Sequence, residues 1–145
     1  MILCGVKIPF QFSLEGHSDG DVAIHSVVDA ILGAISMGDI GQHFPSTEDK
    51  WKNCNSKLFL EQVMELLQTV GGKVIHLDLT IICNAPNISR FRNPMRTQMS
   101  EIMDIPVETI SIKATTTDGL GFTGRGEGIA AVSYTHLTLP TILLV

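Results

Sequence analysis

Residues 17–25 read His-Ser-Asp-Gly-Asp-Val-Ala-Ile-His, which puts two histidines and two aspartates into one short polar segment. The segment leads directly into apolar residues that are spaced for a helix. Unpaired backbone N–H groups and the helix dipole at such a start attract anions. The stretch therefore predicts a metal or phosphate site at the beginning of a helix. The alternative is an ordinary capped helix with a solvated polar face.

The helix itself is predicted from about Ser18 to Met37, because apolar residues recur there at helical spacing. These apolar residues are Val22, Ile24, Val27, Val28, Ile31, Leu32 and Ile35. Ser18, followed three residues later by Asp21, fits a capping pattern. Asp21, His25 and Asp29 are four residues apart, so we expect them to stack on one face of the helix.

The composition limits the classes of protein to which the chain can belong. It has 145 residues, of which 44% are hydrophobic and 17% charged, and its formal net charge is −5. This length predicts one domain, and the apolar balance suggests that some surface is buried against a partner subunit. The negative charge argues against a nucleic-acid partner. No run reaches the roughly 18 apolar residues that a membrane span needs, so we predict no membrane segment.

The cysteines indicate a reducing compartment. Cys4, Cys54 and Cys83 are odd in number and widely spaced. This pattern fits neither a disulfide framework nor a zinc ribbon, so the cytosol is the expected location.

The remaining pattern predicts an α+β fold, a mixed β-sheet with helices packed on one face. Strands are expected at residues 1–10, 73–83, 109–114 and from 129 onward, and further helices at residues 56–70 and 94–103. We expect Ile75, Leu77, Leu79 and Ile81 to share one face of the second strand, and Leu58, Val63, Leu66 and Leu67 to point inward from the second helix.

Residues 119–124 match the dinucleotide-binding pattern G-x-G-x-x-G letter for letter. Such a motif must open a helix, yet residues 125–128 are broken by glycine and lead back into a strand-like run, so a Rossmann site is rejected. A tight turn and a phosphate-binding loop remain as alternatives. Lys113 and the threonines 115–117 would supply phosphate donors, although threonine runs are also typical of strands.

Five motifs together resemble those of one enzyme family. They are His-Ser-Asp-Gly-Asp-Val-Ala-Ile-His at 17–25, Gly-Asp-Ile-Gly at 38–41, Phe-Pro at 44–45, Asn-Ala-Pro at 84–86 and Lys-Ala-Thr-Thr-Thr-Asp-Gly-Leu-Gly-Phe-Thr-Gly-Arg-Gly-Glu-Gly at 113–128. Their order and spacing resemble the 2-C-methyl-D-erythritol 2,4-cyclodiphosphate synthases of the non-mevalonate isoprenoid pathway. The resemblance covers residues 1–131, which we expect to form a single domain of that kind.

The resemblance implies a homotrimer with active sites at subunit interfaces. Members of the family that the sequence resembles convert 4-diphosphocytidyl-2-C-methyl-D-erythritol 2-phosphate to the cyclic 2,4-diphosphate and release CMP. This reaction makes them phosphorus–oxygen lyases. The enzyme would fold this nucleotide-diphosphate substrate back on itself and neutralise its charge. Zn²⁺ would orient the phosphates, and Mg²⁺ or Mn²⁺ would bridge the diphosphate. The implied location is the cytoplasm of a bacterium, or a plastid in a eukaryote.

Carried over by position, the resemblance also implies roles for individual residues. His25 would be a zinc ligand, and His17 and Thr116 would stabilise the transition state. The implied substrate-binding residues are Ser18, the group Asp39, Ile40, Gly41, Phe44, Pro45, Ser46, Thr47 and Glu48 around methylerythritol, the group Cys83, Ala85, Pro86 and Asn87 around cytidine, and the group Thr115, Thr117, Asp118, Phe122 and Arg125 along the diphosphate.

Two parts of the sequence depart from the family pattern. The family opens with Gly-Phe-Asp-x-His, whose Asp and His are the other two zinc ligands, and this sequence begins after that segment. Because catalytic zinc sites use three protein ligands, we expect weak zinc binding and poor turnover. Residues 132–145 match nothing in the family, and we expect them to be a non-native tail. The alternative function is an inactive fragment or a non-catalytic module that binds cytidine diphosphate.

Overall fold

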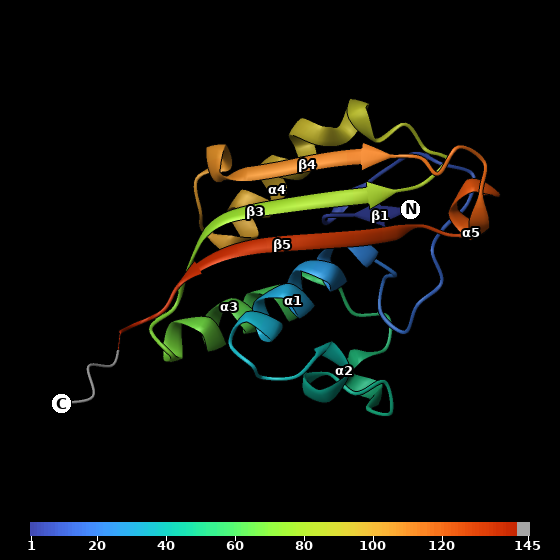
Figure 1. The fold of residues 1–145 in the computed structure, drawn as a ribbon. Helices are drawn as coiled ribbons and strands as arrows, with labels where there is room; N and C mark the ends of the chain where they lie inside the picture. The colour runs from blue at the N-terminus through green and yellow to red at the C-terminus, as the bar shows by residue number, and fades with distance from the viewer. Residues whose placement is uncertain (142–145) are drawn as a thin grey trace.

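The computed structural model describes residues 1–141 and has an α+β fold (Figure 1). Its main sheet contains β3 (Lys73–Ile82), β4 (Ile110–Thr115) and β5 (Ala130–Thr138), in the order β4-β3-β5. Strand β4 runs parallel to β3, and β5 runs antiparallel to it. The sheet is therefore mixed, as the sequence predicted.

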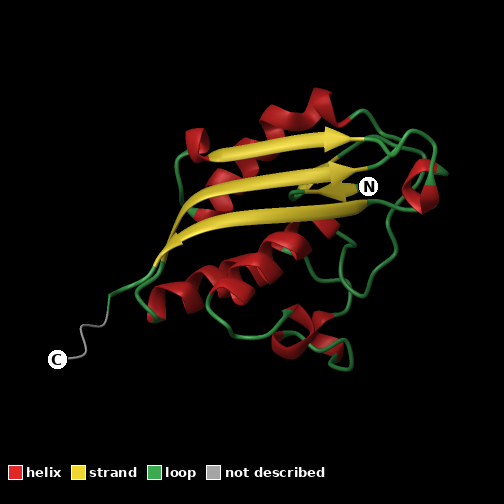
Figure 2. Cartoon of the chain, viewed as in Figure 1, coloured by secondary structure: helices red, strands yellow, loops and turns green. Residues whose placement is uncertain are grey.

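Three long helices lie on the same side of this sheet (Figure 2): α1 (Val22–Ala34), α3 (Lys57–Thr69) and α4 (Arg92–Met103). Helix α1 contacts β5, α4 contacts β4, and α3 packs against both helices. The short elements are β1 (Ile2–Leu3), β2 (Val6–Lys7), α2 (Ile40–His43), η1 (Asp49–Trp51), η2 (Ile88–Phe91), η3 (Val107–Thr109) and α5 (Gly121–Gly124). The one-sided helical layer confirms the predicted fold class.

The core fills the space between the sheet and this helical layer. Leu77, Leu79 and Ile81 of β3 are fully buried there, as predicted. The prediction for Ile75 is wrong, because its side chain is 50% exposed. The β3–β5 register shifts between Val74 and His76, and this irregularity turns Val74 inward in place of Ile75.

The helix and strand boundaries correct the sequence prediction at several places. Helix α1 is shorter at both ends than residues 18–37, and its N-cap is Asp21 rather than Ser18. In α3, Leu58 is exposed, and Phe59 takes an inward position instead. The expected strand over residues 1–10 is two short antiparallel strands, joined by a turn in which Cys4 and Gly5 have positive φ angles.

The spacing predicted that Asp21, His25 and Asp29 stack on one face of the helix, but Asp21 is buried whereas His25 is exposed. The side chain of Asp21 is 2% exposed. One carboxylate oxygen accepts hydrogen bonds from the N–H groups of Ile24 and Cys4, both at 3.0 Å, and the other accepts from the N–H of Gly5 at 2.7 Å. This single side chain therefore caps α1 and fastens the turn between β1 and β2 to it.

The end of the chain contributes to the sheet. Residues 132–138 belong to β5, which pairs with β3 from Lys73↔Thr138 to Ile82↔Ala130. Residues 142–145 of the predicted tail lie outside the described part of the chain. The foreign origin of residues 132–145 stays a prediction. Within residues 1–141, no helix combines the length and apolar character that a membrane crossing requires.

Burial makes Asp21 a source of pH-dependent stability. Desolvation raises the pKa of Asp21 from 3.8 to about 6, and the hydrogen bonds from Ile24, Gly5 and Cys4 oppose this rise. Between these two pH values the folded chain binds a proton that the unfolded chain does not. The resulting stability is fully present below about pH 4 and is lost as the pH rises through about 6, a change of roughly 3 kcal/mol.

We therefore expect Asp21→Asn, which cannot titrate, to remove this dependence. As the pH rises from about 4 to about 7, the free energy of unfolding of the original chain should fall relative to that of the variant. Urea unfolding of both proteins across this range measures the difference. Parallel pH profiles would contradict desolvation as the main influence on this carboxyl group.

Candidate functional site

A pocket of about 520 Å³ opens beside the start of α1. One side is formed by residues 15–18, 20–22 and His25, and the other by residues 40, 41 and 44–47, with Ser56 and Phe59 behind them. The pocket thus brings His17, Ser18 and His25 together with Ile40, Gly41 and the predicted segment from Phe44 to Thr47. These predicted site residues share one cavity in a single chain.

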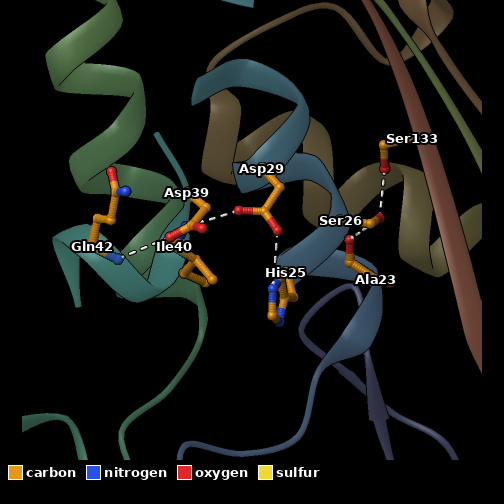
Figure 3. A network of polar contacts seen from close by, with 8 residues as sticks. All are labelled: Ala23, His25, Ser26, Asp29, Asp39, Ile40, Gln42 and Ser133. Carbon is orange, nitrogen blue, oxygen red and sulfur yellow. Dashed lines mark hydrogen bonds and ion pairs between the residues drawn. The ribbon is translucent and has the colours of Figure 1, made fainter. Parts of the chain in front are cut away.

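His25 lies on the exposed surface of α1, one turn before Asp29 (Figure 3). Its Nε2 atom is 3.0 Å from Oδ2 of Asp29. Because a carboxylate can only accept, Nε2 carries the proton and leaves the lone pair of Nδ1 available in the neutral ring. Such a partner orients an imidazole for ligation of a metal or for hydrogen bonding to a substrate.

The lining residues on the far side of the pocket belong to the segment 40–56, which we call the pocket wall. The ring of Phe44 is buried against Phe59 and Trp51, with centroid distances of 4.6 and 5.1 Å. The cation of Lys50 lies 4.7 Å from the centroid of Trp51. This aromatic cluster anchors the middle of the wall on α3.

Two residues that were assigned to the methylerythritol group do not line the pocket. Asp39 is the N-cap of α2, where its carboxylate accepts the N–H of Gln42 at 3.0 Å. Glu48 forms an ion pair with Lys50 at 2.6 Å. Asp39 therefore holds the start of α2 and Glu48 pairs with its neighbour Lys50, and a direct role of either in substrate binding stays a prediction.

The residues that were assigned to cytidine and to the diphosphate lie elsewhere, at the C-terminal ends of β3 and β4 and around α5 (Figure 1). Parallel strands bring their ends together, and the N–H of Cys83 donates to the carbonyl of Thr115 at 3.1 Å. No residue of these two groups lines the pocket that contains His17. A single chain therefore holds the predicted site as two separate halves.

In the second half of the predicted site, around the ends of β3 and β4, some side chains already have hydrogen-bond or ion-pair partners within the chain. The hydroxyl of Thr117 donates to the carbonyl of Leu120 at 2.5 Å, so it closes the turn. Arg125 pairs with Glu127 at 2.7 Å, and this carboxylate raises the pKa of the guanidinium. Thr115, Thr116 and Asp118 remain exposed at the strand end. Phe122 and Arg125 are also more than half exposed, so a ligand can reach them as well.

The described residues do not complete a zinc site. No group of three or more His, Cys, Asp or Glu side chains that could hold a metal ion gathers anywhere in residues 1–141. His25 offers one imidazole nitrogen, whereas a catalytic zinc ion requires three protein ligands. The thiol of Cys83 is buried, which raises its pKa and keeps it protonated, so it is a poor metal ligand.

Three residues around the pocket were missing from the sequence-based assignment. Asp29 could have been included, because its spacing of four residues from His25 indicates a helical pair. Asp19 and Ser56 form hydrogen bonds with each other across 37 positions. No local pattern in the sequence predicts such a contact.

Comparison with known proteins identifies the family. The YgbB family profile matches residues 1–138, beyond the residue at which the resemblance was expected to end. A bifunctional enzyme IspD/IspF of Caulobacter vibrioides is 49% identical over 138 residues, which are 95% of this chain and 36% of that protein. This chain therefore spans about a third of the length of that relative.

Solved structures agree with the sequence comparison. The bifunctional IspDF of Campylobacter jejuni has a TM-score of 0.92 at 40% identity, covering 96% of this chain and 38% of that one. A 2C-methyl-D-erythritol-2,4-cyclodiphosphate synthase with bound CDP has a TM-score of 0.87 at 31% identity, covering 95% of this chain and 89% of that one. The family profile and this nearly complete overlap show that the chain belongs to the YgbB family.

Proposed function

We propose that this chain acts as a 2-C-methyl-D-erythritol 2,4-cyclodiphosphate synthase in isoprenoid biosynthesis. The observation that carries the proposal is the pocket that gathers His17, Ser18 and His25 opposite the pocket wall. The similar synthase structure contains CDP, which supports a nucleotide-diphosphate substrate. The bacterial relatives support a cytoplasmic location.

The proposed reaction is an intramolecular phosphoryl transfer. An oxygen of the substrate's 2-phosphate attacks the β-phosphorus of its own diphosphate, forming the cyclic P–O–P linkage. The bond from that phosphorus to the oxygen of the cytidylate breaks, and CMP leaves with this oxygen. Because the substrate supplies the nucleophile, the chain has to position the two phosphates and stabilise the charge of the transition state.

The two halves of the site suit these two tasks. His17, at the mouth of the pocket before α1, and Thr116, at the end of β4, are proposed to donate hydrogen bonds to the transferred phosphoryl group. The residues of the pocket wall that line the pocket, Ile40, Gly41 and residues 44–47, would hold the methylerythritol, and the exposed groups near Thr115 and Asp118 would hold the diphosphate. Since one chain separates the halves, a complete site requires a neighbouring subunit.

Divalent metals are proposed to assist, with Zn²⁺ near His25 and Mg²⁺ or Mn²⁺ at the diphosphate. When bound, such ions would neutralise phosphate charge. Within residues 1–141, no group of three or more ligand-type side chains gathers around His25. Accordingly, no step of the reaction is assigned to a metal.

The uncovered face of the sheet supports a homotrimer. The helices occupy the opposite face, while Val132 and Tyr134 of β5 are 58% and 64% exposed. On the same uncovered face, His76 stacks edge-on against His136, and Nδ1 of His76 is buried without a hydrogen-bond partner in residues 1–141. Packing of copies through this face would bury the apolar groups and could supply the missing partner.

Catalysis is tested by incubating the purified chain with 4-diphosphocytidyl-2-C-methyl-D-erythritol 2-phosphate, Mg²⁺ and Zn²⁺, and measuring CMP by chromatography. His17→Gln and Thr116→Val should each lower kcat by about 100-fold or more, because each removes a donor to the transition state. Glu65→Gln, at an exposed position of α3, is the control and should retain full activity. Binding of CDP without any CMP release would instead indicate a non-catalytic module.

Weak zinc binding is the second expectation. With one imidazole available, titration calorimetry should give a Kd on the order of micromolar or weaker, far above the values of complete zinc sites. His25→Ala should abolish the remaining heat of binding. Tight binding that survives His25→Ala would show that this residue is not a ligand.

Assembly is tested by light scattering after size-exclusion chromatography. The chain should elute as a trimer, and Val132→Asp should shift it toward the monomer, because a charge on the uncovered face must be desolvated on packing. Leu58→Asp places the same charge on an exposed site of α3 and should leave the trimer intact. Equal behaviour of the two variants would argue against this face.

A further inference from the structure

We propose that Asp19 and Asp29 are positioning residues that clamp the two ends of the pocket wall and so set the width of the pocket. Neither side chain needs to touch the substrate for this role. The inference rests on the proposed function only in treating the pocket as the substrate site.

The first end of the wall is held by Asp29. Its Oδ1 atom accepts the N–H of Ile40 at 2.8 Å, while its Oδ2 atom lies 3.0 Å from Nε2 of His25 (Figure 3). The N–H of Ile40 belongs to the first turn of α2, where a helix has no internal acceptor. One carboxylate therefore joins the beginning of the wall to a side chain on the opposite side of the pocket.

The second end of the wall is held by Asp19 in the same manner. Its Oδ2 atom accepts the N–H of Ser56 at 2.9 Å, and its Oδ1 atom accepts the hydroxyl of Ser56 at 2.5 Å and the N–H of Asp21 at 3.1 Å. Ser56 is 4% exposed. A further bond links the backbones, from the N–H of Asn53 to the carbonyl of His17 at 2.9 Å.

Between these clamps the wall has little regular structure of its own. It contains only the short helices α2 and η1 and no strand, and the aromatic contacts of Phe44 and Trp51 fix its middle on α3. The ends are fixed by carboxylates from the segment that carries His17 and His25. Removing either carboxylate leaves a backbone donor without its acceptor, which favours local opening of that end.

The competing interpretation is that both aspartates merely stabilise loops and have no bearing on the pocket. Under that interpretation their loss lowers global stability but leaves ligand affinity unchanged in the folded protein. If the two aspartates clamp the wall, removing one of them lets the wall open locally while the core stays folded. A ligand that contacts the wall then binds more weakly.

Hydrogen exchange on the full chain separates these cases. Asp29→Ala should speed exchange of the Ile40 amide, and Asp19→Ala that of the Ser56 and Asn53 amides, each by about tenfold, with the β3 amides unchanged. Asp49→Ala is the matched control, since Asp49 is an exposed carboxylate of the same wall with no side-chain bond or ion pair in residues 1–141. Unchanged exchange at the wall amides would overturn the clamp.

A rescue and a kinetic measurement link the clamp to the pocket. Asp29→Asn keeps an oxygen that can accept from Ile40, so it should restore the slow exchange that Asp29→Ala loses. In assays of CMP release, both alanine variants should raise KM by about tenfold and change kcat much less, because the wall binds ground state and transition state alike. A KM equal to that of Asp49→Ala would overturn the link to substrate binding.

The two proposals fail in different ways. If the unmodified chain releases no CMP, the proposed activity fails, and the clamp is judged by hydrogen exchange and by the Kd of the unreacted 4-diphosphocytidyl-2-C-methyl-D-erythritol 2-phosphate in the same variants. If the unmodified chain is active but the wall amides exchange equally slowly in Asp19→Ala and Asp29→Ala, the clamp fails alone.

Discussion

The buried carboxylate of Asp21 is the contact on which the arrangement around the pocket depends. It binds the first turn of α1 and, 16 and 17 positions earlier in the chain, the turn between β1 and β2. Burying a charge costs desolvation energy, which is the cause of the raised pKa of Asp21. The three N–H donors offset part of that cost. The arrangement holds the N-terminal turn beside α1, and the segment with His17 and Ser18 runs between these two fixed points.

Three aspartates of one short segment thus have three different environments. Asp21 is buried and accepts hydrogen bonds from backbone N–H groups. Asp19 accepts the N–H of Ser56 at the start of α3, and Asp29 lies on the surface beside His25. Helical periodicity predicted the His25–Asp29 pair, because residues four apart on a helix always meet. It failed for Asp21 and made no prediction for Asp19, and the partners of both come from distant segments. For Asp21 and Asp19 the decisive contacts are tertiary, and the position of these residues in the sequence pattern does not predict them.

The sheet illustrates the same division between local and tertiary information. Alternation in residues 73–83 predicted β3 and its inward-facing leucines, since the period of two follows from strand geometry. The exposure of Ile75 was not predictable, because the register shift beside it arises from pairing with β5, whose His136 lies 60 positions after His76. The motifs predicted which residues belong to the site. The pocket contains only the predicted residues near the start of α1 and those of the pocket wall, and none from the motif at 113–128.

The separation of the two halves is itself informative about how such a site can work. Phosphoryl transfer within one substrate requires donors at both ends of a folded-back molecule, so the groups that hold the two ends should approach from different directions. The histidine pocket lies beside the helical layer, and the exposed threonines lie at the strand ends. In a single chain the two halves lie apart, and the packing of copies through the uncovered face is proposed to close them around a ligand. In this arrangement assembly and catalysis would depend on the same surface, because the contact that buries the open sheet would also bring the threonines of one subunit toward the histidines of the next.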